Sequence, residues 1–143
     1  MTATSAPTSR HVPRRVLCLT AGAVLCYGGV AALANHVHGD AAMFRAALVQ
    51  GASSGITTFG LSTLIERGLA LLRRRGVGRR TSAAVVGPAA ASLGATLHVA
   101  VNAWAGTPGL LATVALPIVA LAIYCPLYVA AALRAMPPLP GPR

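Results

Sequence analysis

Charged side chains are scarce in this chain of 143 residues, and acidic ones are almost absent. Only 10% of the residues are charged, against about 25% in ordinary soluble domains, so too few polar side chains exist to cover a soluble surface. Lys and Arg number 12 and Asp and Glu only 2, which gives a formal net charge of +10. A hydrophobic content of 55% excludes a compositionally disordered chain. The composition therefore predicts a multi-pass membrane protein and no nucleic-acid partner.

Catalytic motifs are missing as well. The sequence has no C-x-x-C, no H-E-x-x-H and no glycine-rich phosphate-binding loop. Cys18 and Cys26 lie two helical turns apart, roughly 12 Å, which is too far for a disulfide. We therefore expect no enzyme activity and no cofactor.

Long apolar runs dominate what remains. A bilayer is crossed by roughly 20 residues of helix, and four stretches reach that length, which predicts an all-α bundle of four transmembrane helices over residues 16–134. Asp40 is expected to cap the second helix, and Thr107, followed by Pro108, is expected to begin the fourth. The expected spans are 16–37, 46–70, 83–105 and 110–133, flanked by a disordered N-terminus (1–15) and a proline-rich tail (135–143).

The arginines predict the orientation of these helices. With four spans, every arginine except Arg45 falls on one side of the membrane. The positive-inside rule then places both termini in the cytoplasm, in a bacterial-type inner membrane. The basic loop 73–80 is expected to meet anionic lipid headgroups. Its cationic residues are Arg73, Arg74, Arg75, Arg79 and Arg80.

The first span has a second interpretation. Arg14 and Arg15, the apolar run and the small residues Ala32 and Ala34 resemble a secretory signal with an A-x-A cleavage site. The run is longer than the usual signal core of about 7–15 residues, so we expect the span to be retained.

Small residues provide the expected helix contacts. Lipid is as apolar as leucine, so membrane helices associate through close packing and a few polar contacts. Gly51 and Gly55 form a GxxxG pair in the second span, and Gly94 lies on a small-residue face of the third. A weak internal repeat also aligns Asn35 with Asn102, each just before an outer turn.

The main candidates for chemistry are polar side chains expected inside the membrane. Gln50 and Ser54 belong to a polar stripe on the second span, and His98 and Asn102 lie one turn apart on the third. The four-span topology brings these residues to similar depth. Such residues serve either as packing contacts between helices or as a hydrophilic path.

The histidines offer a metal or haem site as an alternative interpretation. His36 and His38 flank the end of the first span, so together with His98 they form a candidate metal or proton-relay cluster. His36 and His98 are alternatively a pair of axial haem ligands across helices. The simplest alternative is that His98 is hydrogen-bonded to Gln50 or Asn102.

Three functions follow, and no family motif decides among them. The first is a non-enzymatic accessory or assembly component that self-associates or binds another membrane protein. The second is a small solute or ion transporter or channel that uses the polar candidates Gln50, Ser54, His98 and Asn102. The third is a metal- or haem-binding electron carrier.

Overall fold

The computed structural model describes residues 14–136, with side-chain surroundings from residue 17 onward. Four long helices follow one another: α1 (Arg14–Asn35), α2 (Asp40–Arg74), α3 (Arg79–Trp104) and α4 (Leu110–Ala135), with a short 3-10 helix, η1 (His36–His38), between α1 and α2. The described chain contains no strand, so the expected all-α class is confirmed. The expected tails fall largely outside the described residues.

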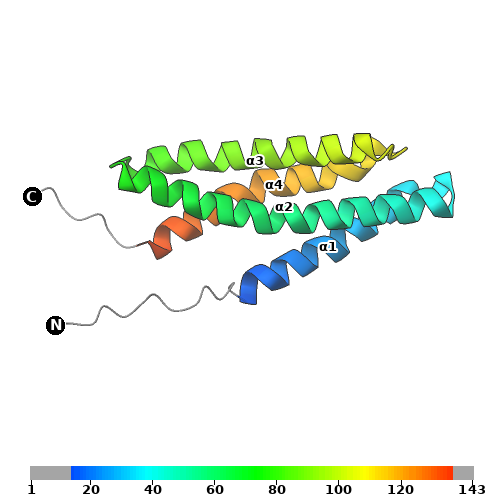
Figure 1. Ribbon diagram of the computed structural model, residues 1–143, viewed down its shortest axis with the longest axis horizontal. Helices are drawn as coiled ribbons and strands as arrows, with labels where there is room; N and C mark the ends of the chain where they lie inside the picture. Colours follow the sequence, from blue (N-terminus) through cyan, green and yellow to red (C-terminus); the bar gives the residue numbers. More distant parts are fainter. Residues whose placement is uncertain (1–13, 137–143) are drawn as a thin grey trace, which may run out of the picture.

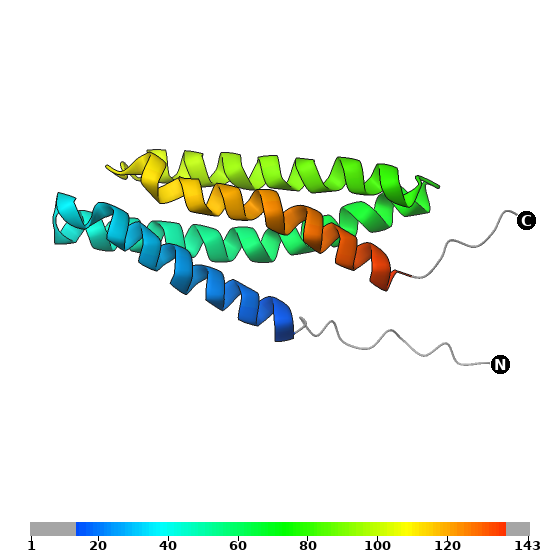
Figure 2. The same ribbon diagram turned by 180° about the vertical axis from the view of Figure 1, so that it is seen from behind.

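The helices run alternately up and down (Figure 1). Turns 36–39 and 105–109 lie at one end of the bundle, which we call the hairpin end. The start of α1, the end of α4 and the turn at 75–78 lie at the opposite, basic end (Figures 1 and 2). α2 contacts each of the other long helices, whereas α1 and α3 make no contact within the described chain. Towards its N-terminus α1 separates from α2 in both views.

Three of the four helices are long and apolar enough to cross a membrane. These segments are Leu17–His38, Arg79–Trp104 and Leu110–Ala135. The second expected span does not meet that criterion, because its helix carries many polar residues. α2 has 35 residues, a length of about 52 Å at 1.5 Å per residue, so it exceeds the thickness of a bilayer core.

Glycines terminate two helices. At the end of α3, Gly106 adopts φ 63°, its N–H donates to Ala103 O, and Thr107 N–H donates to Asn102 O. This pair of bonds is a Schellman motif, which requires a left-handed residue that glycine adopts without strain. Gly76, with φ 76°, ends α2 by the same arrangement.

Two expected helix starts were wrong. Thr107 does not cap α4, because its hydroxyl hydrogen-bonds to Asn102 of the preceding helix, and the N-cap position belongs to Gly109. Asp40 is the first residue of α2 rather than its cap. Gly39, with φ 91°, occupies that position and makes no side-chain hydrogen bond.

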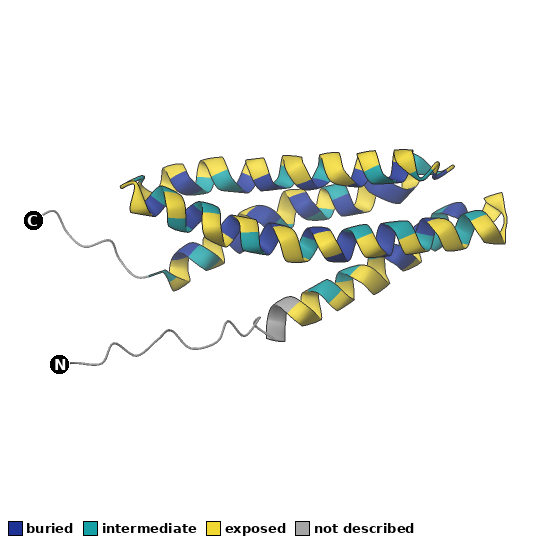
Figure 3. Ribbon diagram, viewed as in Figure 1, coloured by how far each residue is buried: buried dark blue, intermediate teal, exposed yellow. Residues whose placement is uncertain are grey.

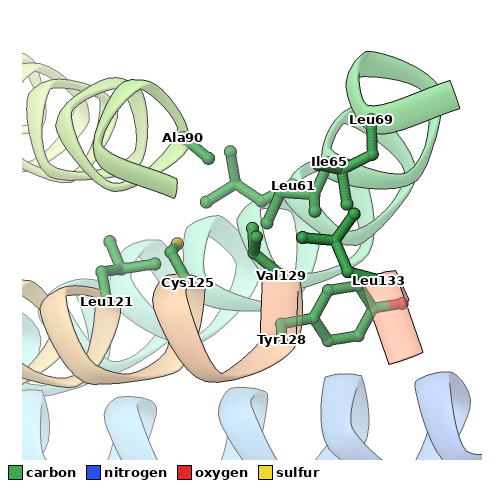
Figure 4. Packing of buried hydrophobic residues seen from close by; sticks show 9 residues of the cluster. All are labelled: Leu61, Ile65, Leu69, Ala90, Leu121, Cys125, Tyr128, Val129 and Leu133. Carbon is green, nitrogen blue, oxygen red and sulfur yellow. The ribbon is translucent and has the colours of Figure 1, made fainter. Parts of the chain in front are cut away.

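The apolar core lies in the basic half of the bundle. It is formed by the C-terminal halves of α2 and α4 with part of α3, and α1 contributes nothing to it (Figures 3 and 4). Ile65 and Leu69 on α2 and Cys125 on α4 are completely buried. The full cluster is Leu61, Ile65, Leu69, Ala90, Leu121, Cys125, Tyr128, Val129 and Leu133.

Close backbone approach joins α1 to α2 nearer the hairpin end. A Cβ on Gly51 would lie 3.0 Å from Val24 O and 3.5 Å from Gly28 Cα. A Cβ on Gly55 would lie 2.6 Å from a methyl of Val24. A Cβ on Gly94 of α3 would lie 2.9 Å from a methyl of Leu61 on α2 and 2.8 Å from a methyl of Leu121 on α4. The three glycines singled out in the sequence thus lie at close helix contacts, where a larger residue requires its neighbours to shift.

Candidate functional site

Four polar side chains meet near the hairpin half of the bundle, and all four are buried. Gln50 Nε2 donates to Ser54 Oγ at 3.1 Å and lies 3.2 Å from His98 Nδ1. Asn102 Nδ2 donates to Gln50 Oε1 at 2.6 Å. The residues proposed from the sequence as polar intramembrane candidates therefore form one network, which links α2 to α3.

Helical spacing explains why these side chains meet. Residues four apart lie on one face of a helix, so Gln50 and Ser54 face the same way from α2, and His98 and Asn102 face the same way from α3. The two helices are antiparallel neighbours joined at the basic end. Their pairs therefore reach the same depth after running back through the bundle.

The network determines which ring nitrogen of His98 carries the proton. Asn102 Nδ2 also donates to His98 O at 2.9 Å, so the orientation of the Asn102 amide is set by a backbone carbonyl. The Gln50 atom facing Asn102 Nδ2 must then be oxygen, and its nitrogen faces His98. An amide nitrogen only donates, so His98 Nδ1 accepts and the proton of the neutral ring resides on Nε2.

A second amide, Asn35, joins α1 to α4. Asn35 is completely buried and its Nδ2 donates to Ala31 O and to Thr113 Oγ1, both at 2.9 Å. Its Oδ1 accepts from Gly109 N at 3.0 Å, at the start of α4. Asn102 shares part of this pattern: its Nδ2 donates to the carbonyl four residues earlier and to a side chain of another helix. The Oδ1 atoms of both asparagines accept from the same turn, at Gly109 and at Thr107. The weak sequence repeat thus corresponds to similar amide donor contacts, whereas the acceptor contacts differ.

A cavity of about 300 Å³ adjoins the network. All four long helices contribute to its lining, and most of the lining residues belong to α1 and α4. Most of its wall is apolar or small, including Leu19, Gly22 and Leu121. Its polar lining consists chiefly of His98 and residues with hydroxyl groups, which are Tyr27, Ser54, Thr57, Thr58 and Tyr124. Pro117, one of two prolines inside α4, also lines it.

Polar side chains continue along α2 towards the basic end. Ser62 Oγ donates to Thr58 O at 2.7 Å and lies 2.9 Å from Tyr124 Oη. One turn further, Tyr128 donates from its hydroxyl to Glu66 Oε1 at 2.7 Å, and the two tyrosine rings stack at 5.4 Å. The stripe expected at Gln50 to Thr57 therefore extends, at intervals of four residues, to Glu66.

The histidine cluster is not assembled. His36 and His38 are exposed in η1, and His36 Nδ1 lies 2.6 Å from Leu33 O, while His98 is buried against Gln50. Within the described residues, no group of three or more His, Cys, Asp or Glu side chains is placed to hold a metal ion.

Arginines at the helix ends bind backbone carbonyls. Arg79 donates to Leu133 O near the end of α4, where the helix dipole favours a cation. At the opposite end, Arg45 of α2 reaches Gly106 O at 3.4 Å and links α2 to the turn at 105–109. Arg73 is 6% exposed, whereas Arg74, Arg75 and Arg80 are exposed.

Several residues of the site were missing from the sequence interpretation. Thr113, Tyr124 and Tyr128 were not singled out, because an isolated hydroxyl in an apolar helix carries no sequence signal until its partner helix is known. Tyr124 and Tyr128 are four residues apart, which is the one pattern that points to a shared face. Comparisons with protein-family models, curated proteins and solved structures find no match.

Proposed function

We propose that this chain is a non-enzymatic accessory or assembly component of a membrane, with four spans and both termini on the cytoplasmic side of a bacterial-type inner membrane. The supporting observation is the closed network around Gln50. Both amide hydrogens and the carbonyl oxygen of Gln50 are used within the bundle. A polar cluster whose central amide has all its hydrogen bonds within the bundle rigidifies and specifies helix packing.

The proposed topology requires α2 to span the membrane together with the three apolar helices. The side chains that lower the hydropathy of α2, such as Gln50, Ser54 and Ser62, are buried against other helices, so a polar stripe does not prevent α2 from spanning. Packing of Gly28 on Gly51 supports retention of α1 as a helix of the bundle. The basic loop would then meet anionic headgroups on the cytoplasmic side.

Cysteine labelling in intact cells tests this topology. In a background with Cys18, Cys26 and Cys125 replaced by alanine, His38→Cys at the hairpin end and Gly78→Cys at the basic end are compared. A membrane-impermeant maleimide is expected to label only His38→Cys before lysis and both afterwards. Labelling of both before lysis, or of Gly78→Cys alone, contradicts the proposed topology.

Assembly is tested on the tagged full chain expressed at its native level. Membranes are extracted as native nanodiscs and analysed by native mass spectrometry, with an unrelated four-span monomer extracted in parallel as the control. A discrete complex heavier than the 14.4 kDa chain is expected. A population of monomers alone, extracted under conditions that preserve known complexes, contradicts an assembly role.

A second candidate, a small transporter or channel, is favoured by the cavity beside His98 and the polar row that leads to Glu66. Proteoliposomes loaded with a pH-sensitive dye measure proton flux under an imposed gradient. A transporter loses this flux in His98→Ala, with Ser53→Ala, whose hydroxyl bonds only the carbonyl of Gln50, as the matched control. Equal proton flux in vesicles with wild type, vesicles with His98→Ala and empty vesicles would contradict a proton-transport function.

A further inference from the structure

The cavity between α1 and α4 has the features of a ligand site. Four helices line it, and its volume of about 300 Å³ is at the lower end of small-molecule sites. Its lining is mostly apolar, with few polar groups, and none of the described residues that line it is charged. A low-dielectric cavity without a counter-charge disfavours an ionised guest, so its occupant is uncharged.

His98 makes the polar contact of this cavity specific. Its Nδ1 is occupied by Gln50, and Asn102 fixes the orientation of Gln50. The ring nitrogen that remains is therefore an N–H donor, on a residue that lines the cavity. A donor held in this way selects a ligand that offers an acceptor oxygen.

The entrance is determined by α1. Its exposed side chains in this region, including Leu19 and Leu25, are apolar. α1 and α4 run in roughly the same direction (Figure 2), and both contribute residues to the cavity lining. Both helices are among those apolar enough to span a membrane. In a bilayer, a gap between two such helices faces acyl chains rather than water.

We propose that this cavity binds an uncharged, lipid-soluble molecule through a carbonyl oxygen that accepts a hydrogen bond from His98 Nε2, as in a quinone headgroup. The ligand enters laterally between α1 and α4, and its apolar part lies against Gly22 and Leu121. Ser54 and Tyr124 supply further hydroxyls in the lining. Binding at this site requires neither transport nor a redox step.

The probe is tritiated decylubiquinone, and the protein is the full chain in nanodiscs. Saturable binding is expected, displaced by unlabelled decylubiquinone. Decylbenzene, which has the same tail and no oxygen, is expected not to compete. Palmitate, which is anionic, is likewise expected not to compete. Equal competition by decylbenzene overturns the role of the donor, and equal competition by palmitate overturns selection for an uncharged head.

Two glycines of α1 provide matched variants. A Cβ at Gly22 or at Gly29 meets nothing within 4 Å, so leucine fits at either position and improves helix propensity. Only Gly22 lines the cavity. Gly22→Leu is expected to abolish saturable binding and Gly29→Leu to retain it. Equal binding by these two variants, or no saturable binding by the wild type, overturns the site.

Two substitutions of His98 test the roles of its two ring nitrogens separately. An asparagine amide reproduces the position of Nδ1 and preserves an acceptor for Gln50, but it cannot reach the position of Nε2. His98→Asn is therefore expected to weaken binding about 3- to 10-fold, as for one lost hydrogen bond. His98→Gln, whose amide reaches the Nε2 position, retains most of the affinity. In ¹⁵N-histidine-labelled wild type, decylubiquinone shifts one buried Nε2–H signal; binding without that shift contradicts the proposed contact.

Discussion

The two halves of this bundle are held together in different ways. In the basic half, α2, α3 and α4 pack aliphatic and aromatic side chains around Ile65, Leu69 and Cys125. In the hairpin half, amides and hydroxyls connect the helices in pairs, α2 to α3 through Gln50 and Asn102 and α1 to α4 through Asn35. The cavity lies beside α1, which takes no part in the apolar core.

This difference indicates that apolar packing and hydrogen bonds contribute to the bundle in different ways. In the proposed membrane, apolar side chains would gain little by moving from hydrocarbon to protein, so the basic half would depend on close packing and dispersion. Hydrogen bonds are directional, so the hairpin half sets which helices pair and at what register. α1 takes no part in the apolar core. It is held by glycine contacts with α2 and by the bonds of Asn35, and towards its N-terminus it separates from α2.

The largest effect is expected in the apolar half. Ile65 is completely buried, and Ile65→Ala leaves a cavity that the rigid helices cannot close. A loss of about 2 kcal/mol in the free energy of unfolding is expected, the lower end for a buried Ile→Ala. Unfolding by SDS in mixed micelles measures it. Ile56→Ala on the same helix is the control, because Ile56 is 74% exposed; equal losses would show that the apolar core contributes nothing.

Removing the central amide is expected to cost slightly less. Gln50→Leu leaves His98 Nδ1 and an Asn102 hydrogen without partners inside the bundle, at about 1–2 kcal/mol. The same SDS titration measures this, with Ser53→Ala as a neutral control. A Gln50→Leu variant as stable as wild type would mean that the network does not hold α2 to α3.

The link from α1 to α4 depends on Asn35. Asn35→Ala frees the Gly109 N–H and the Thr113 hydroxyl and is expected to destabilise the protein by about 1 kcal/mol. Amide exchange followed by mass spectrometry should show faster exchange at the start of α4 and unchanged exchange around Leu69. Uniform acceleration along all helices would contradict two separately stabilised halves.

The smallest effect is expected for Tyr128→Phe. The ring stays in the apolar core, and only the bond from its hydroxyl to Glu66 is lost. Because Glu66 is exposed and lies outside the apolar core, the cost is expected to be about 0.5 kcal/mol. A loss as large as that of Ile65→Ala in the SDS titration would show that the basic half also depends on its polar contact.

Much of the fold was predictable because it is local. Runs of apolar residues separated near Gly39, Gly76 and Gly106 predict four helices, and the observed bounds differ from the expected spans by a few residues at most positions. The largest difference is in α2, which begins at Asp40, whereas the second span was expected to begin at residue 46. The helix caps were predicted less well, since Gly39 and Gly109 occupy positions assigned to Asp40 and Thr107.

The candidate site was predictable only in part. Intramembrane amides and an imidazole are costly wherever they lie, so Gln50, His98 and Asn102 stand out in an apolar chain. Asn35 was noticed only through the repeat, and the tyrosines of α4 not at all. The role of a single hydroxyl can be assigned only when its hydrogen-bond partner is known.

The sequence by itself determined the helices, their order and the gathering of arginines at one end, because these follow from local hydropathy and from turns of a few residues. Only the tertiary structure decided which amide meets which helix, which nitrogen of His98 carries the proton and where the cavity lies. Lipid does not drive helices together by hydrophobicity. In the proposed membrane, their arrangement would therefore depend on a few close glycine contacts and directional bonds between residues far apart in the chain.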